Sequence, residues 1–156
     1  MEGKTKKYLF RLAPIVLLAV LLTWAESKAV FVLSDSVSHK LMYRSEETVH
    51  KGDYVMFPLV HEYLGTGDTP QNLTKIYRCA PGDVLQNKKR LFFCNGEYIG
   101  RAKERGYNGQ PLQPFEWNGP IPDGKAFVAG EHADSFDSRY WGFVDIVKLK
   151  RVVPIV

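Results

Sequence analysis

Beyond residue 28, short apolar runs alternate with turn residues along the chain. β-branched and aromatic residues fill these runs, and Gly, Pro, Asn and Asp lie between them, which is typical of short strands joined by turns. The runs that we predict as strands span residues 29–33, 53–57, 73–78, 90–94, 97–100, 126–129, 142–144 and 146–153. Asn95-Gly96, between two of the runs, is the strongest hairpin signal. Strands at near-regular spacing predict a mainly β domain, a coiled β-sheet or β-barrel, and not a parallel α/β fold.

A different pattern covers the first 25 residues. An apolar stretch, residues 12–25, follows four basic residues between positions 4 and 11. Basic residues before an apolar stretch keep that end in the cytoplasm and send the rest of the chain across the membrane. Two interpretations stay open: a retained transmembrane signal-anchor, or a signal peptide cut by a peptidase that reads Thr23 and Ala25.

These patterns divide the chain into three parts. Residues 1–11 are expected to form a basic cytoplasmic flank and residues 12–25 the membrane helix. Residues 26–156 then form a single domain on the periplasmic side of a bacterial inner membrane. Pro and Gly residues between positions 101 and 125 predict an irregular excursion from this domain.

The overall charge narrows the range of partners. The chain carries 21 Lys and Arg against 17 Asp and Glu, a net charge of +4, and several of the basic residues lie in the N-terminal flank. The body of the chain has no block of Lys and Arg interleaved with aromatic residues, and no glycine-rich phosphate loop. We therefore expect a membrane and a protein as partners, and no nucleic acid.

The chain has two cysteines, Cys79 and Cys94. Nothing outside the cytoplasm keeps thiols reduced, so we predict a disulfide between them; two buried free thiols are the alternative. Neither cysteine has the Cys and His neighbours that a zinc site needs, and we predict no metal site.

Three short segments carry candidate chemistry: residues 34–37 (Ser-Asp-Ser-Val), Lys75 ahead of residues 81–83 (Pro-Gly-Asp), and residues 135–142 (Ser-Phe-Asp-Ser-Arg-Tyr-Trp-Gly). Ser36 directly follows a predicted strand, where loops expose reactive groups, and we predict it as a nucleophile. A serine hydroxyl needs a base to take its proton. Lys75 can be that base only if its pKa falls from about 10.4 to about 7–8, a shift that burial among apolar side chains can produce.

Other polar residues of these segments have predicted supporting roles. Ser34 lies two residues before the nucleophile, on the same side of an extended chain; it either adds its hydroxyl to an oxyanion hole or caps its own loop. Ser135 can hydrogen-bond the lysine and orient it. Asp137 and Arg139 can pair and so fix the structure of their loop.

A histidine base is less well supported by the sequence. The four histidines are scattered, and the chain has no Gly-x-Ser-x-Gly nucleophile elbow. We therefore expect these residues in loops or on the surface, and His132 with its acidic neighbours offers too few ligands for a metal site.

In this order, the three segments resemble the type I signal peptidases, and more closely their conjugative-transfer branch, the TraF-like pilin-processing peptidases. The resemblance runs from the membrane segment to near the end of the chain, and also includes residues 51–57 and 121–130. His39 stands where the general signal peptidases carry Pro, and residues 131–134 replace a run that is one residue longer. The Ser-Phe-Asp-Ser-Arg-Tyr form of the last segment, the single membrane segment and the small size favour the conjugative branch.

The resemblance implies a β-rich core in which Ser36 and Lys75 form a catalytic dyad, Ser34 assists the oxyanion hole and Ser135 contacts the lysine. It implies a membrane-bound precursor as substrate, bound as an added strand with small residues before the cut, and no metal or organic cofactor. In the conjugative branch the precursor is a pilin, and some members join its new end to its own amine to make a cyclic product.

From these observations we predict a membrane-anchored serine endopeptidase of the signal peptidase type that processes a conjugative pilin precursor, by hydrolysis or by cyclisation. One alternative is a general signal peptidase that removes leader peptides from many exported proteins. Another is a non-catalytic envelope protein of a conjugation or pilus-assembly complex that has kept the fold.

Overall fold

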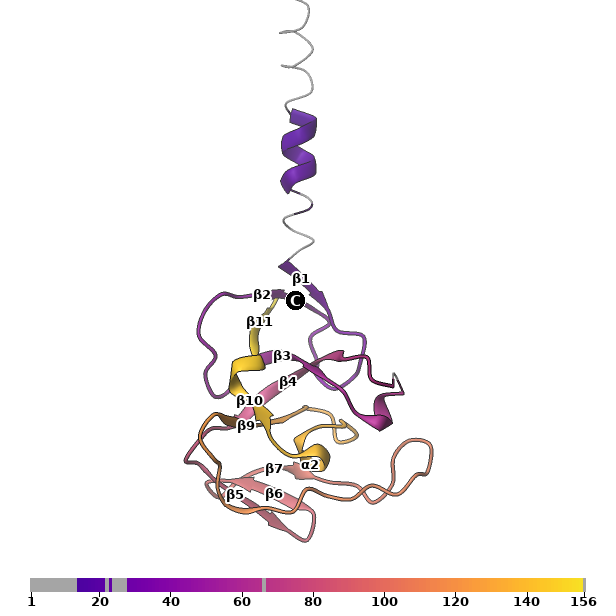
Figure 1. Ribbon diagram of the computed structural model, residues 1–156, viewed down its shortest axis with the longest axis vertical. Coiled ribbons are helices and arrows are strands. Elements are labelled where there is room, and N and C mark those ends of the chain that lie inside the picture. The colour runs from indigo at the N-terminus through magenta and orange to yellow at the C-terminus, as the bar shows by residue number, and fades with distance from the viewer. Residues whose placement is uncertain (1–13, 22, 24–27, 66, 156) are drawn as a thin grey trace, which may run out of the picture.

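The computed structural model describes residues 14–21, 23, 28–65 and 67–155, and β-strands dominate this part of the chain (Figure 1). The strands are β1 (Ala29–Phe31), β2 (Leu41–Arg44), β3 (Tyr54–Leu59), β4 (Gln71–Cys79), β5 (Val84–Lys88), β6 (Leu91–Cys94), β7 (Glu97–Arg101), β8 (Asn118–Pro120), β9 (Lys125–Ala129), β10 (Val144–Asp145) and β11 (Lys150–Pro154). The domain also contains the 3₁₀ turns η1 (Glu62–Leu64) and η2 (Ile146–Lys148), and the short helix α2 (Ser138–Trp141).

A seven-stranded sheet forms the larger part of the domain. Its strands follow the order β1-β2-β11-β3-β4-β9-β10, and all the described pairs are antiparallel. Val55 of β3 lies opposite Lys75 of β4, so the lysine sits on an interior strand of the sheet. β1 is an edge strand, and it leads directly into the segment that contains Ser36.

A smaller sheet has the strand order β7-β6-β5-β8. β6 and β7 are joined by Asn95 and Gly96, whose φ angles are 50° and 86°. A type I′ turn requires positive φ at both central residues, which Asn and Gly adopt at low cost. The hairpin predicted at this dipeptide is therefore confirmed.

The two sheets meet in an apolar core, and a disulfide within this core cross-links them. Phe92 of β6 stacks on Phe127 of β9, with ring centroids 5.5 Å apart, and both side chains are fully buried. A disulfide joins Cys79 of β4 to Cys94 of β6, with 5.8 Å between the Cα atoms. The predicted pairing of the two cysteines is thus present, and it links one sheet to the other.

The prediction of a mainly β domain is confirmed, with three qualifications. Both sheets are open, because the outer strands of each have no further partner among the described strands. The pattern also missed β2 and β5, whose sequences Leu-Met-Tyr-Arg and Val-Leu-Gln-Asn-Lys are too short or too polar to read as β runs, and β8, which lies within the predicted irregular excursion. The last predicted run, residues 146–153, begins as the turn η2, and its strand starts only at Lys150.

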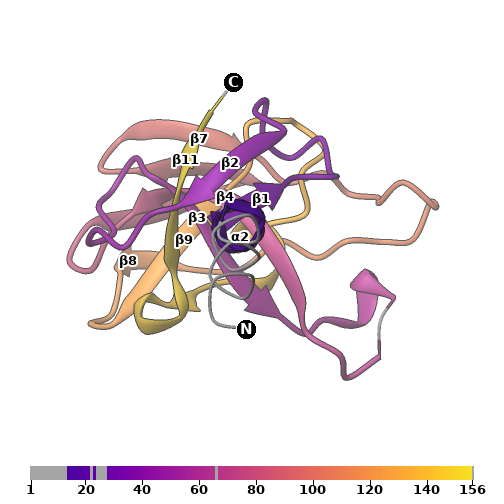
Figure 2. The same ribbon diagram turned by 90° about the horizontal axis from the view of Figure 1, so that it is seen from above.

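The chain between β7 and β8 forms a long loop with an isolated bridge between Arg105 and Pro111. At its end, β8 pairs with β5 of the smaller sheet. In Figures 1 and 2 this loop and η1 project from the same side of the domain.

The predicted N-terminal parts are only partly within the described residues. The flank, residues 1–11, lies outside them, as do several residues of the predicted membrane segment, 12–25. Residues 14–21 are helical and their side chains are exposed. Over the residues that the structure describes, no helix has both the length and the apolar character that crossing a membrane requires.

Candidate active site

Three residues that are far apart in the sequence meet at one buried point. Lys75 Nζ donates a hydrogen bond to Ser36 Oγ over 2.5 Å and another to Ser135 Oγ over 2.9 Å. Ser36 lies in a turn after β1, Lys75 on β4, and Ser135 in the loop between β9 and α2. The three residues are only 8%, 3% and 4% exposed. The structure therefore brings together the predicted nucleophile, the predicted base and the predicted orienting serine.

Burial changes the acidity of the lysine. The pKa of Lys75 falls from 10.5 to about 8, chiefly because burial disfavours its charged form; the carboxylate of Asp137 opposes this shift and the charge of Arg139 adds to it. Leu73 and Tyr77, on the same face of β4, belong to the surrounding apolar cluster. A lysine with this pKa is partly neutral near pH 8, and a neutral amine can accept a proton from a hydroxyl group.

Gly130 allows the two serines to approach the lysine together. A Cβ atom at this position would lie 2.2 Å from Ser135 Oγ and 2.6 Å from the carbonyl oxygen of Ser36. Both distances are far below a van der Waals contact, so the packing at this point requires glycine. The next residue, Glu131, donates its main-chain N–H to the carbonyl of Ser36 over 2.7 Å.

A buried ion pair holds the loop that carries Ser135. Arg139 and Asp137 are 2% and 0% exposed, and their side chains are 2.7 Å apart. Arg139 also donates to the carbonyl of Ser135 over 3.0 Å and to the carbonyl of Arg101 over 2.9 Å. Asp137 accepts the main-chain N–H of Gly130 over 2.9 Å. The pair therefore connects this loop to the ends of β7 and β9.

Ser34 lies outside the buried group. It is exposed, and its carbonyl accepts a hydrogen bond from Lys40 Nζ over 2.7 Å. The expectation that Ser34 and Ser36 share one side of an extended chain is wrong, because this segment bends and turns. The turn, and not the alternation of side chains along a strand, therefore sets the direction of the Ser34 hydroxyl relative to Ser36.

The described histidines take part in other contacts. His39 packs edge-on against Tyr54 at 5.6 Å, and His61 packs against Phe136 at 5.0 Å. His132 Nδ1 accepts the main-chain N–H of Asp134 over 3.1 Å and so supports its own loop.

A cavity of about 410 Å³ is lined by the residues on either side of Ser135, but not by Ser36, Lys75 or Ser135 themselves. Its lining includes both neighbours of Ser135, Asp134 and Phe136, together with Tyr63 of η1 and Tyr107 of the loop between β7 and β8. Figures 1 and 2 show the backbone of η1 and of this loop projecting from the same side of the domain. Tyr63, Tyr107 and Phe136 give this cavity aromatic walls.

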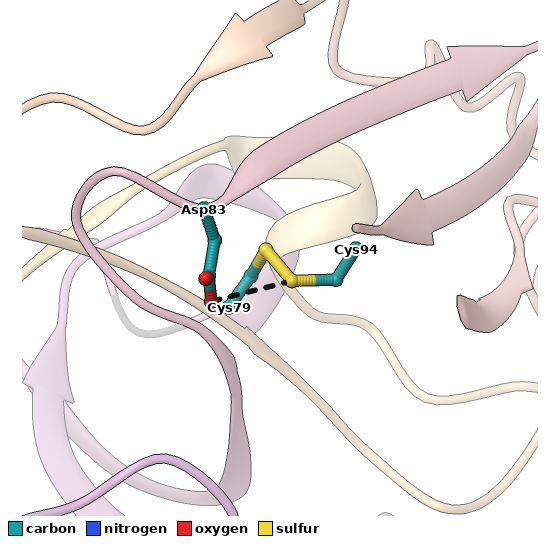
Figure 3. Close-up of side chains that lie close together, drawn as sticks. All are labelled: Cys79, Asp83 and Cys94. Carbon is teal, nitrogen blue, oxygen red and sulfur yellow. Dashed lines mark hydrogen bonds between the residues drawn. A yellow bond between two sulfur atoms is a disulfide. The ribbon is translucent and has the colours of Figure 1, made fainter. Parts of the chain in front are cut away.

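Figure 3 shows the one place in the described chain where potential metal ligands gather, at Cys79, Asp83 and Cys94. The two sulfur atoms are bonded to each other, so neither is available as a thiolate ligand. Asp83 instead accepts hydrogen bonds from Lys51 and Asn95, each over 2.8 Å. This cluster therefore has a structural role, and it stabilises the turn between β4 and β5.

Sequence reasoning missed two residues of the site. Glu131 and Tyr54 contact the Ser36 segment or its neighbours, yet neither stands out by residue type or spacing. The sequence contained only coarse signals: residues 51–57, which include Tyr54, belong to the resemblance, and residues 131–134 depart from the general signal peptidase pattern.

Comparison with known proteins identifies the class. A family profile described as "Signal peptidase, peptidase S26" matches residues 5–153, so the chain belongs to this family of serine peptidases, which act on membrane-associated preproteins. The chain is also similar to a signal peptidase I from Enterococcus faecalis V583, solved as a crystal structure at 2.27 Å resolution. The two are 21% identical with a TM-score of 0.45, over 70% of this chain and 99% of that one. No curated protein matches the sequence.

Proposed function

We propose that this chain is a membrane-anchored serine endopeptidase in which Ser36 is the nucleophile and Lys75 is the general base. The observation that carries the proposal is the 2.5 Å contact between Lys75 Nζ and Ser36 Oγ, made by a buried lysine whose pKa is about 8. A nucleophile within hydrogen-bond reach of a base that is neutral at working pH is the arrangement that acyl transfer needs.

The reaction follows from this pair. Neutral Lys75 takes the proton of Ser36 as Oγ attacks the scissile carbonyl, and then gives that proton to the leaving amine. The acyl-enzyme is released when Lys75 deprotonates a water molecule, which attacks the ester and restores the Ser36 hydroxyl. The main-chain N–H of Ser36 and the hydroxyl of Ser34 are the proposed donors to the oxyanion.

Ser135 is proposed to orient the base. Its hydroxyl accepts the second hydrogen bond of Lys75, which leaves fewer positions for the flexible amine. The buried pair of Asp137 and Arg139 holds the Ser135 carbonyl and so fixes this contact. No metal or organic cofactor takes part in the proposed reaction.

The position of Ser36 also suggests how a substrate binds. β1 is an edge strand with no partner on its outer side among the described strands, and the nucleophile follows it within a few residues. An extended precursor segment can add to such an edge through main-chain hydrogen bonds. We propose that this precursor is presented at the periplasmic face of the inner membrane, where residues 12–25 anchor the enzyme.

The proposed substrate is a conjugative pilin precursor. The form of residues 135–140 and the single membrane segment, which resemble the conjugative branch, support this choice. If the precursor's own amine replaces water, it attacks the acyl-enzyme, an amide forms, Ser36 is released and no water is consumed. A general signal peptidase is the second candidate, because the matching family profile is described as "Signal peptidase, peptidase S26".

The test is co-expression of the full chain with candidate pilin precursors and with an unrelated secretory precursor, followed by intact-mass analysis. Ser36→Ala and Lys75→Ala run beside the wild type. Processing of a pilin precursor that both substitutions abolish supports the proposal, and a product lighter by one further water indicates cyclisation. Equal processing of the secretory precursor points to a general signal peptidase. Processing that survives both substitutions contradicts the mechanism and leaves the non-catalytic envelope protein as the better account.

A further inference from the structure

We propose that Glu131 is a positioning residue that holds the turn of residues 36–38 and so keeps Ser36 against Lys75. The proposal rests on the proposed roles of Ser36 and Lys75 as nucleophile and base. It concerns a residue that lies outside the Ser36, Lys75 and Ser135 group and touches none of the reacting atoms.

Glu131 forms hydrogen bonds with both ends of the turn, at Ser36 and at Ser38. Its main-chain N–H donates to the carbonyl of Ser36 over 2.7 Å, and its carboxylate accepts the main-chain N–H of Ser38 over 2.6 Å. The other carboxylate oxygen accepts the hydroxyl of Tyr54 over 2.7 Å. The short segment from Ser36 to Ser38 is therefore bonded at each end to one residue.

The third contact ties this residue to the strand pair that carries the base. Tyr54 begins β3 and lies opposite Ile76, the residue after Lys75 on β4. Along the chain, Glu131 comes just after β9 and Gly130. The strand β9 also pairs with β4. The nucleophile turn is thus held against the lysine strand from two neighbouring strands.

The charge of Glu131 strengthens these contacts. Burial acts to raise the pKa of its carboxyl group, but hydrogen bonds from Tyr54 and Ser38, with a smaller effect of His39, hold the pKa below its ordinary value. Burial and the nearby carboxylate in turn raise the pKa of the Tyr54 hydroxyl, which remains a donor. Hydrogen bonds to an ionised acceptor are shorter and stronger than those between neutral groups.

Loss of this carboxylate has two expected effects on the reaction. The Ser38 N–H loses its acceptor, so the turn relaxes and Ser36 Oγ moves away from Lys75 Nζ; misplacement by about 1 Å can cost on the order of a hundredfold in rate. Water also gains access to Lys75, and its pKa rises toward the ordinary lysine value. Both effects act on the chemical step and leave substrate binding largely unchanged.

The test compares Glu131→Ala, Glu131→Gln and the control Glu116→Ala, which removes an exposed glutamate from the loop between β7 and β8. With the full chain and a precursor that the wild type cleaves, kcat and KM are measured across pH. Glu131→Ala should lower kcat by about 10- to 100-fold at nearly constant KM and move the midpoint of the pH profile upward. Glu131→Gln should recover most of the rate, since its amide oxygen can still accept the Ser38 N–H.

Two results would overturn the proposal. One is a Glu131→Ala variant with the kcat and the pH-profile midpoint of the wild type. The other is a Glu131→Gln variant whose kcat is as low as that of Glu131→Ala. If the alanine variant does not fold, Glu131→Asp takes its place. That variant keeps the charge but is one methylene too short to reach both Ser38 and Tyr54, so it should be slower than wild type. Wild-type kcat in Glu131→Asp would then count against the proposal.

A second measurement needs no substrate. Amide hydrogen exchange of the segment around Ser38 should be faster in Glu131→Ala than in the wild type, and unchanged in Glu116→Ala. Equal exchange in Glu131→Ala and the wild type would overturn the proposed hold on the turn. A wild type that cleaves no precursor would instead count against the proposed function, so the two failures are distinguishable.

Discussion

At the scale of single residues, the proposed mechanism depends on the protonation state of Lys75. Its pKa of about 8 against an ordinary 10.5 means that burial disfavours the charged amine by roughly 3 kcal/mol. The same burial favours the neutral amine, which is the form that can accept the Ser36 proton in the proposed reaction. Contacts such as the Ser135 hydrogen bond then direct the amine toward its task.

The pH dependence of the reaction follows directly. Below about pH 8 the lysine is protonated and cannot act as a base, so kcat should fall about tenfold for each further pH unit. Above pH 8 the rate should level off. A kcat profile on a precursor peptide measures this, and a midpoint near 6.5 would indicate a histidine as the base.

Gly130 makes a second prediction at this scale. Gly130→Ala places a methyl group against Ser135 Oγ and the carbonyl of Ser36, so both must move. We expect kcat to fall by about a hundredfold and the free energy of unfolding to fall by about 1–3 kcal/mol. Gly106→Ala is the matched control, because its methyl group would meet only the flexible end of the Gln110 side chain. Equal activity in both variants would contradict this account of the packing.

The sequence predicted the candidate nucleophile and base and some of their supports, Ser135 and the pair of Asp137 and Arg139, but not the roles of Glu131 and Gly130. Ser36, Lys75 and Ser135 each lie in a segment with a recognisable pattern, and the structure brings their side chains together. Glu131, through its main chain and its carboxylate, and Gly130, through its lack of a side chain, act on residues distant in the sequence, and a local pattern does not reveal such contacts. The lowered pKa of Lys75 was expected as a requirement, while its cause, the apolar face of β4, needed the strand register.

At the scale of elements, the loop before α2 is ordered by its own side chains. Asp137 accepts the main-chain N–H of Arg139 over 3.1 Å and thereby caps the start of this four-residue helix. The same carboxylate pairs with the Arg139 side chain, which is buried. One acidic residue therefore satisfies the helix end, the buried guanidinium and the Gly130 N–H together.

Removal of this carboxylate should be costly. Asp137→Ala leaves Arg139 as an unpaired charge in a buried position, and we expect a loss of about 3–5 kcal/mol in the free energy of unfolding. Denaturant unfolding measures this effect. Asp123→Ala, at an exposed carboxylate in the turn before β9, serves as the control and should change stability by less than about 0.5 kcal/mol. A small effect in Asp137→Ala would show that the pair adds little to the fold.

The pattern of apolar runs located most strands because each carries β-branched or aromatic residues next to clear turn signals. It failed where tertiary pairing outweighs local preference. β5 contains Gln86, Asn87 and Lys88, yet it pairs with both β6 and β8. The order of strands in the two sheets, with β11 inserted between β2 and β3, also lay beyond a local reading of the chain.

At the scale of the whole molecule, the disulfide is the covalent link between the two sheets. Cys79 ends the strand that carries Lys75, and Cys94 ends the central β6 strand of the smaller sheet. Closing a loop of this length restricts the unfolded chain and is worth about 3 kcal/mol.

Replacement of both cysteines tests this value. The double variant Cys79→Ser, Cys94→Ser should unfold about 3 kcal/mol more easily than the oxidised wild type, and at a similar denaturant concentration to the reduced wild type. Intact mass should show a gain of two hydrogens on reduction of the wild type alone. Unfolding of the oxidised wild type and the double variant at the same midpoint would show that the bond does not stabilise the fold.

The position of this bond has a consequence for when the protein reaches its full stability. A chain newly made in the reducing cytoplasm lacks the link between its sheets, and gains it only where an oxidant is supplied. If the domain lies on the periplasmic side, as proposed, its biogenesis depends on the thiol-oxidising capacity of the cell envelope, and strains poor in that capacity should accumulate less of the protein.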